Sequence, residues 1–86
     1  MKSSTTSDFG ELYRALTPDA RAQARKTYRL WRDNPRHPSL HFQRKGHYWS
    51  IRVSQGYRAL GREYQGAFYW FWIGPHDEYE RILSRR

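Results

Sequence analysis

Residues 67–73 read Ala-Phe-Tyr-Trp-Phe-Trp-Ile, and no other stretch of the sequence is as densely apolar. An apolar run of about four to eight residues between turn signals is typical of a strand that is buried on both faces. Here the turn signals are Gln65-Gly66 before the run and Gly74-Pro75 after it. The sequence therefore predicts a central strand with protein above and below it.

The residues before this strand alternate between apolar and polar with a period of two, as half-buried strands do. Trp49, Ile51 and Val53 share one face of such a strand, and its other face is expected to be surface. Further along, Gly61 indicates a β-bulge. The pattern predicts an antiparallel meander with strands at residues 40–43, 48–53, 57–64 and 67–73.

Two amphipathic helices are expected before the strands, because apolar residues recur there at intervals of three and four. Asp8 and Glu11 have the spacing of a capping box and open the first helix. Thr17 followed by Pro18 combines a hydroxyl cap with a proline at the first helical position. The second helix is expected to end near Asp33.

The two ends of the chain complete the predicted fold. Residues 1–7 are polar and are expected to be flexible, with a short first strand as the alternative. Asp77 and Glu80 again have capping-box spacing and predict a short last helix through Leu83. Residues 1–86 thus predict one α+β domain, a helical hairpin packed on a small antiparallel sheet of about four strands, with a short C-terminal helix.

The composition favours a small packed domain without covalent cross-links. The 86 residues include no cysteine, so neither a disulfide framework nor a thiolate zinc site is expected, which fits a cytoplasmic protein. Aromatic residues make up 17% of the chain and can supply the core. No apolar run approaches the ~20 residues of a membrane span, and the N-terminus lacks the apolar middle of a signal peptide.

The charge is strongly positive, at +8, which favours phosphates or an acidic protein as partners. Between Asn34 and Arg62 there is no Asp or Glu, and basic residues alternate with aromatic ones. Such a sheet face offers cations for phosphates and flat rings for unpaired bases. A solvated surface, on which basic residues deter aggregation, explains the pattern equally well. The candidate RNA-binding residues are Arg44, Lys45, His47, Tyr48 and Arg62.

A candidate catalytic group lies where the central strand ends. His76 follows that strand directly, and histidine is the residue type best suited to acid–base work near neutrality. Tyr79 is in the first turn of the last helix, and the meander can bring Arg52 and Arg58 to the same groove. A histidine beside a helix start and a tyrosine that closes the core are the structural alternatives.

Such a groove suits RNA cleavage, because RNA supplies its own nucleophile in the 2′-hydroxyl group. The reaction then needs a base, an acid and positive charge for the crowded phosphorane. The sequence has no HExxH motif and no glycine-rich phosphate loop, so no metal site and no cofactor are predicted.

Four motifs occur in order along the chain: Arg32-Asp-Asn-Pro-Arg-His-Pro38, Tyr48-Trp-Ser-Ile-Arg-Val53, Gly56-Tyr57-Arg58 and Trp72-Ile-Gly-Pro-His76-Asp-Glu-Tyr79. Their order and spacing resemble the RelE/ParE-like toxins of bacterial type II toxin–antitoxin systems. The resemblance implies a small antiparallel sheet against a helical hairpin. It also implies an mRNA endonuclease, or mRNA interferase, which often cleaves within a translating ribosome.

The resemblance also assigns roles to single residues. Arg58 matches the family's phosphate-contacting arginine, and Arg52 matches a basic position on the preceding strand. His76 and Tyr79 match positions that several branches use for acid–base work. The chain differs where some nuclease members carry a further basic residue on the second strand, because Ser50 and its neighbour Trp49 are found there.

The implied partner is an antitoxin whose acidic segment neutralises the basic groove. By the same resemblance, operator DNA is bound only through the toxin–antitoxin complex. Two alternatives remain open from the sequence. One is a ParE-like inhibitor of DNA gyrase without catalysis, although members of that kind commonly lack the pair formed by His76 and Tyr79. The other is a non-catalytic module that binds nucleic acid or a protein partner.

Overall fold

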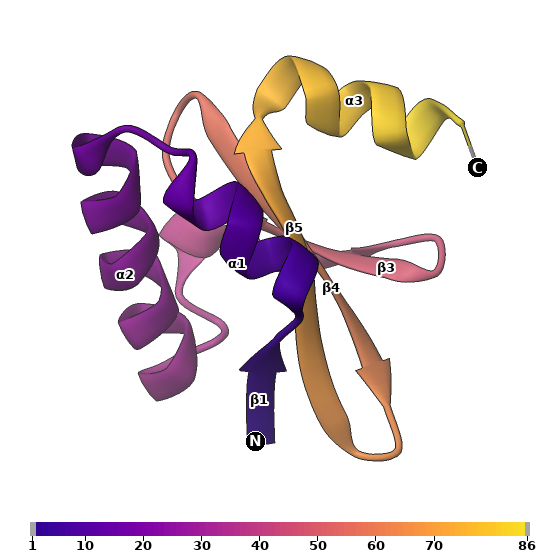
Figure 1. Cartoon of the computed structure of the whole chain (residues 1–86). Helices are drawn as coiled ribbons and strands as arrows, with labels where there is room; N and C mark the ends of the chain where they lie inside the picture. The colour runs from indigo at the N-terminus through magenta and orange to yellow at the C-terminus, as the bar shows by residue number, and fades with distance from the viewer. Residues whose placement is uncertain (1, 86) are drawn as a thin grey trace.

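The computed structural model describes residues 2–85, which form a five-stranded sheet with helices on both faces (Figure 1). The strand order is β1-β5-β4-β3-β2, and only the β1–β5 pair is parallel. The expected α+β class is confirmed, with one strand more than expected. The elements are β1 (Lys2–Thr5), α1 (Ser7–Arg14), α2 (Pro18–Asp33), the 3-10 turn η1 (Pro38–Leu40), β2 (Gln43–Lys45), β3 (Tyr48–Arg52), β4 (Tyr57–Tyr64), β5 (Ala67–Pro75) and α3 (His76–Ser84).

The additional strand, β1, lies within the N-terminal stretch that was expected to be flexible. Its residues pair in parallel with the first half of β5, from Lys2 opposite Ala67 to Thr5 opposite Trp70. The ladder continues into the next residue, because the backbone N–H of Thr6 donates to the carbonyl oxygen of Trp70 at 3.0 Å. As a result β5 has a neighbouring strand on each side and is a central strand of the sheet.

The first helix begins with a different cap from the one expected. The N-cap is Thr6, whose Oγ1 accepts a hydrogen bond from the backbone N–H of Phe9 at 3.2 Å. Asp8 lies inside the first turn instead, so the predicted capping box with Glu11 is wrong. The cap of α2 is confirmed, because Thr17 Oγ1 accepts from the third residue of that helix at 3.2 Å.

Thr6→Ala is therefore expected to lower the free energy of unfolding by about 1 kcal/mol, because it leaves a helix N–H without its acceptor. Ser7→Ala, which removes the neighbouring hydroxyl, serves as the matched control and should change stability little. Urea unfolding followed by circular dichroism measures both. A larger loss for Asp8→Ala than for Thr6→Ala would favour the capping box instead.

The first strand is expected at residues 40–43, but in the structure the first strand of the meander is β2, at residues 43–45. It pairs only with residues 48–50 of β3. Leu40 belongs to η1, a turn that starts at Pro38 and buries the Leu40 side chain. His41, at φ 46°, follows the turn in a left-handed conformation. Among the described residues, no strand pairs with this edge of β3 beyond residue 50.

A β-bulge in β5 determines which of its residues reach the core. Gly61 is paired with Trp70, but the preceding residue of β4 is paired with Trp72, so Phe71 is the extra residue. The register shift occurs at the expected Gly61, although the inserted residue is on the partner strand. Because of the bulge, Trp70 and Ile73 both lie in the core although they are three residues apart.

The main core lies between the sheet and the helical hairpin of α1 and α2. Trp31 of α2 is 2% exposed, and its ring centroid lies 5.8 Å from Phe42, 5.3 Å from Phe68 and 5.2 Å from Trp70. Tyr28, three residues before Trp31 on the same helix, is at the rim and 36% exposed. Aromatic rings therefore supply most of the packing, as the composition indicates.

The third helix covers the opposite face of the sheet, apart from α1 and α2 (Figure 1). It starts at His76 without a side-chain cap, so the capping box expected from Asp77 and Glu80 does not form. Ser50, expected on the surface of its strand, is only 3% exposed beneath this helix. None of the helices within residues 2–85 has the length and apolarity needed to cross a bilayer.

Candidate functional site

Two arginines lie opposite each other at the end of the β3–β4 hairpin. Arg52 is the last residue of β3 and is paired with Arg58 of β4. Residues that are directly opposite in an antiparallel ladder project from the same face. That face is the one under α3, because Arg52 lies two positions from Ser50, which contacts the helix. The predicted convergence of the two arginines on one face is confirmed.

The arginine pair concentrates positive charge at one place on the sheet. Like charges that are directly opposite each other in a ladder repel each other. Burial lowers the pKa of Arg58, and the charge of Arg52 lowers it further. Tyr79 and Glu80 of α3 act in the opposite direction on the same pKa, so both lie within electrostatic range of Arg58. An anion bound between the two guanidinium groups would relieve their repulsion.

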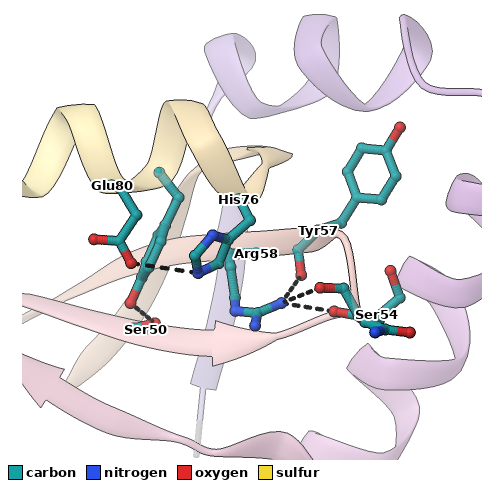
Figure 2. Close-up of polar contacts among 8 residues, drawn as sticks. Ser50, Ser54, Tyr57, Arg58, His76 and Glu80 are labelled. Carbon is teal, nitrogen blue, oxygen red and sulfur yellow. Dashed lines mark hydrogen bonds and ion pairs between the residues drawn. The ribbon is translucent and has the colours of Figure 1, made fainter.

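The Arg58 side chain is held in place by the turn that it follows. Its Nη1 donates to the carbonyl oxygens of Ser54 at 2.6 Å, Tyr57 at 2.9 Å and Gln55 at 3.3 Å (Figure 2). These contacts use one end of the guanidinium group and fix its direction. The charge is therefore positioned before any ligand arrives.

His76 is the first residue of α3 and is fastened to the same turn. Its backbone N–H donates to the carbonyl oxygen of Gly56 at 2.9 Å. Its imidazole Nε2 lies 3.3 Å from a carboxylate oxygen of Glu80, and the side chain is 42% exposed (Figure 2). Glu80 thus lies beside the imidazole and within electrostatic range of Arg58.

Tyr79 lies beside His76, with ring centroids 5.6 Å apart, but its hydroxyl faces the interior. The hydroxyl and Ser50 Oγ are 2.7 Å apart and form a buried hydrogen bond. The Tyr79 side chain is thus buried between α3 and the sheet, with its ring next to the imidazole. No sequence pattern marks Ser50 as this partner, because only the helix that covers the strand distinguishes it from a surface serine.

The buried pair leads to a stability prediction. Tyr79→Phe should lower the free energy of unfolding by about 1–2 kcal/mol, because the hydroxyl of Ser50 then has no partner in the interior. Ser50→Ala should have a similar effect, and the double variant should cost less than the sum of the two. Urea unfolding of the four proteins measures the coupling, with Tyr69→Phe as the exposed control. Additive losses would show that the two hydroxyls do not interact.

Three of the five candidate RNA-binding residues lie on the same face as the arginine pair. Lys45 is opposite Tyr48 in the β2–β3 ladder, and Tyr48 lies two positions from Ser50 on β3. The Tyr48 ring packs against Phe71, with centroids 5.1 Å apart. Arg62 follows Arg58 on β4 at an even interval and is exposed. These residues extend the basic and aromatic surface away from His76.

The strand register does not place the other two residues on that face. Arg44 is opposite Trp49, whose ring packs toward the hairpin of helices, so Arg44 projects from the other face of the sheet. Its Nε donates to the carbonyl oxygen of Gly46 at 3.0 Å. His47 occupies the β2–β3 turn and is exposed. Because successive residues of a strand point to opposite faces, Arg44 is on the other face from Lys45. The total charge of the segment does not show which face each residue is on.

The chemistry available at the site is that of imidazole, guanidinium and carboxylate groups. Within the part of the chain that the structure describes, no group of three or more His, Asp or Glu side chains could hold a metal ion. His76 can accept or donate a proton, and the arginine pair can hold a phosphate. The arrangement can therefore support proton transfer next to a bound phosphodiester.

The chain is similar to known proteins in sequence and in fold. A family model described as "ParE-like toxin domain" matches residues 18–81. Among curated proteins no sequence match is found. A YoeB/ParE toxin from Agrobacterium tumefaciens is similar in structure, with a TM-score of 0.67 and 19% identity, covering 88% of this chain and 99% of that one.

Two further structures have the same fold. The isolated RelE toxin of E. coli has a TM-score of 0.63 and 17% identity, covering 98% of this chain and 96% of its own. A RelB–RelE antitoxin–toxin complex from Methanococcus jannaschii contains a chain with a TM-score of 0.70 and 11% identity, covering 91% of this chain and 95% of its own. At these identities the similarity establishes the fold.

Proposed function

Since the chain belongs to the ParE-like toxin domain family, we propose that it is the toxin of a type II toxin–antitoxin system and cleaves mRNA without a metal ion. The observation that carries this proposal is the arginine pair, Arg52 and Arg58, on the face where His76 is accessible. Two opposed guanidinium groups favour an anion, and a histidine beside a bound phosphodiester can move a proton.

In the proposed reaction the two arginines bind the scissile phosphate and stabilise the charge that develops on it. His76 takes the proton from the 2′-hydroxyl, whose oxygen attacks phosphorus while the bond to the 5′-oxygen breaks. Water protonates the departing 5′-oxygen, so the products are a 2′,3′-cyclic phosphate and a 5′-hydroxyl end. Glu80 orients the imidazole, and Tyr79 acts as a positioning residue because its hydroxyl is bonded to Ser50.

The proposed partners are mRNA, with cleavage on the ribosome or of free RNA, and a cognate antitoxin. The net charge of +8 favours an antitoxin with an acidic segment that covers the basic face. The structure from Methanococcus jannaschii, which pairs a toxin of this fold with its antitoxin, supports a partner of that kind. Operator DNA would be bound through the complex of toxin and antitoxin.

Arg52→Ala tests the proposal with little risk to the fold, because Arg52 ends its strand and is only partly buried. We expect RNA cleavage to fall by about 10²-fold, the usual effect of removing one group that stabilises transition-state charge. Labelled RNA, free and on programmed ribosomes, provides the measurement, and Arg29→Ala on the exposed side of α2 is the control. Unchanged cleavage by Arg52→Ala would exclude the arginine pair from the reaction.

Gyrase inhibition is the second candidate function, and the description of the family model as ParE-like favours it. This function predicts that the protein inhibits DNA supercoiling by purified gyrase while transcripts stay intact. Mapping of transcript ends after a short induction separates the two functions. New 5′-hydroxyl ends within mRNA would support cleavage. Intact transcripts together with inhibited supercoiling would contradict cleavage and support gyrase inhibition.

A further inference from the structure

A pocket of about 610 Å³ opens at the edge of the sheet, between α2, η1 and the β3–β4 turn. It exists because β2 is short and leaves the end of β3 without a partner strand on that side. Thr27 Oγ1 on α2 donates to the carbonyl oxygen of Val53 at 3.0 Å and fastens the helix across this edge. The volume is in the range of small-ligand sites in proteins.

The pocket adjoins the proposed catalytic site through residues that belong to both. Arg52 lines the pocket and is also one member of the arginine pair. Gly56 lines the pocket too, and its carbonyl oxygen accepts the backbone hydrogen bond from His76. A strand of RNA with a phosphate at the arginine pair would therefore have its next nucleotide at the mouth of this pocket.

The lining combines a flat ring, amide groups and positive charge. The ring of Tyr57 is half-buried and points away from Arg58, toward the helices (Figure 2). Gln23, Gln55 and Ser39 supply hydrogen-bond donors and acceptors, and Lys26 adds a second cation to Arg52. None of the described residues that line the pocket is acidic.

We propose that this edge pocket binds the nucleobase adjacent to the cleaved phosphate and sets a base preference for cleavage. A nucleobase fits each part of the lining, because it presents a face that stacks on a tyrosine and an edge that amide groups can read. Lys26 and Arg52 neutralise the phosphates on either side of that base. This inference rests on the proposed RNA cleavage and adds a substrate-recognition site to it.

Binding is tested separately from catalysis in the full-length His76→Ala protein. The probes are the four nucleoside 3′-monophosphates, with ribose 5-phosphate as the probe that lacks a base, and chemical-shift changes and titration are the readouts. We expect at least one nucleotide to bind roughly tenfold more tightly than ribose 5-phosphate, with shifts at the pocket residues. Equal affinity for both kinds of probe would overturn the proposal.

Two pairs of variants locate the binding. Lys26→Ala should weaken nucleotide binding about fivefold and Tyr57→Leu about tenfold, whereas the matched controls Lys2→Ala and Tyr64→Leu, both at exposed positions, should not. Lys26 is exposed on α2, so its variant remains informative even where Tyr57→Leu is destabilised. Unchanged affinity in Lys26→Ala and in a folded Tyr57→Leu would overturn the proposal.

Cleavage provides the second measurement. In the wild-type background, Gln55→Ala should reduce the base preference at one position next to the cut several-fold, with the overall rate less affected. An identical base preference in wild type and Gln55→Ala would contradict a role of the pocket in base recognition. If the chain cleaves no RNA, the proposed function fails, and the nucleotide titration then reports on the pocket independently.

Discussion

His76→Ala is expected to lower the rate of RNA cleavage by about 10²–10⁴-fold, which is the usual contribution of a general acid or base. The imidazole is accessible, and in the proposed reaction it takes the proton from the 2′-hydroxyl next to the arginine pair. Single-turnover cleavage of labelled RNA measures the rate. His47→Ala, which removes an exposed histidine from the β2–β3 turn, is the matched control.

Two further readouts separate a chemical role of His76 from a structural one. The urea midpoint of His76→Ala should stay close to that of the wild type, because the side chain is 42% exposed and its backbone contact with Gly56 does not need the imidazole. Added imidazole should restore part of the lost rate. Cleavage by His76→Ala within threefold of wild type would remove the histidine from the mechanism.

Trp31→Ala is expected to lower the free energy of unfolding by about 3–5 kcal/mol, the range measured when a large aromatic side chain is deleted from a core. Its ring touches the three aromatic residues that fill the centre of the molecule, so no neighbour can close the cavity alone. A loss of this size approaches the total stability of a small domain. The variant should therefore be largely unfolded even without urea.

Urea unfolding followed by far-ultraviolet circular dichroism tests this expectation, with Tyr28→Ala as the control on the same helix. Tyr28 lies at the rim of the core, and its truncation should cost much less. Trp31→Phe, which keeps an aromatic ring, should lie between the two. A loss below 1 kcal/mol for Trp31→Ala would mean that the aromatic cluster can repack around the missing indole.

The sequence predicts the parts of the fold that depend on side-chain periodicity and local caps. The run at residues 67–73 is a central strand, and Thr17 does cap α2. It leaves β1 only as the alternative to a flexible terminus, because parallel pairing uses backbone groups and the polar side chains of residues 2–5 have no apolar period. The pairing in turn places Thr6, rather than Asp8, at the start of α1.

The candidate site likewise has a part that the sequence predicts and a part that it does not. Period-two alternation and hairpin register are enough to place Arg52 and Arg58 on one face, and His76 follows from the end of the last strand. The buried bond between Ser50 and Tyr79 is a contact between elements far apart in the chain. No local pattern marks it, because it depends on where α3 lies against the sheet.

The parallel pairing of β1 with β5 also affects biosynthesis. Residues 2–5 complete the sheet only by pairing with residues 67–70, which lie far along the chain. Contacts of such large sequence separation form late in folding. During synthesis the sheet therefore reaches its native strand order only after residues 67–70 have left the ribosome.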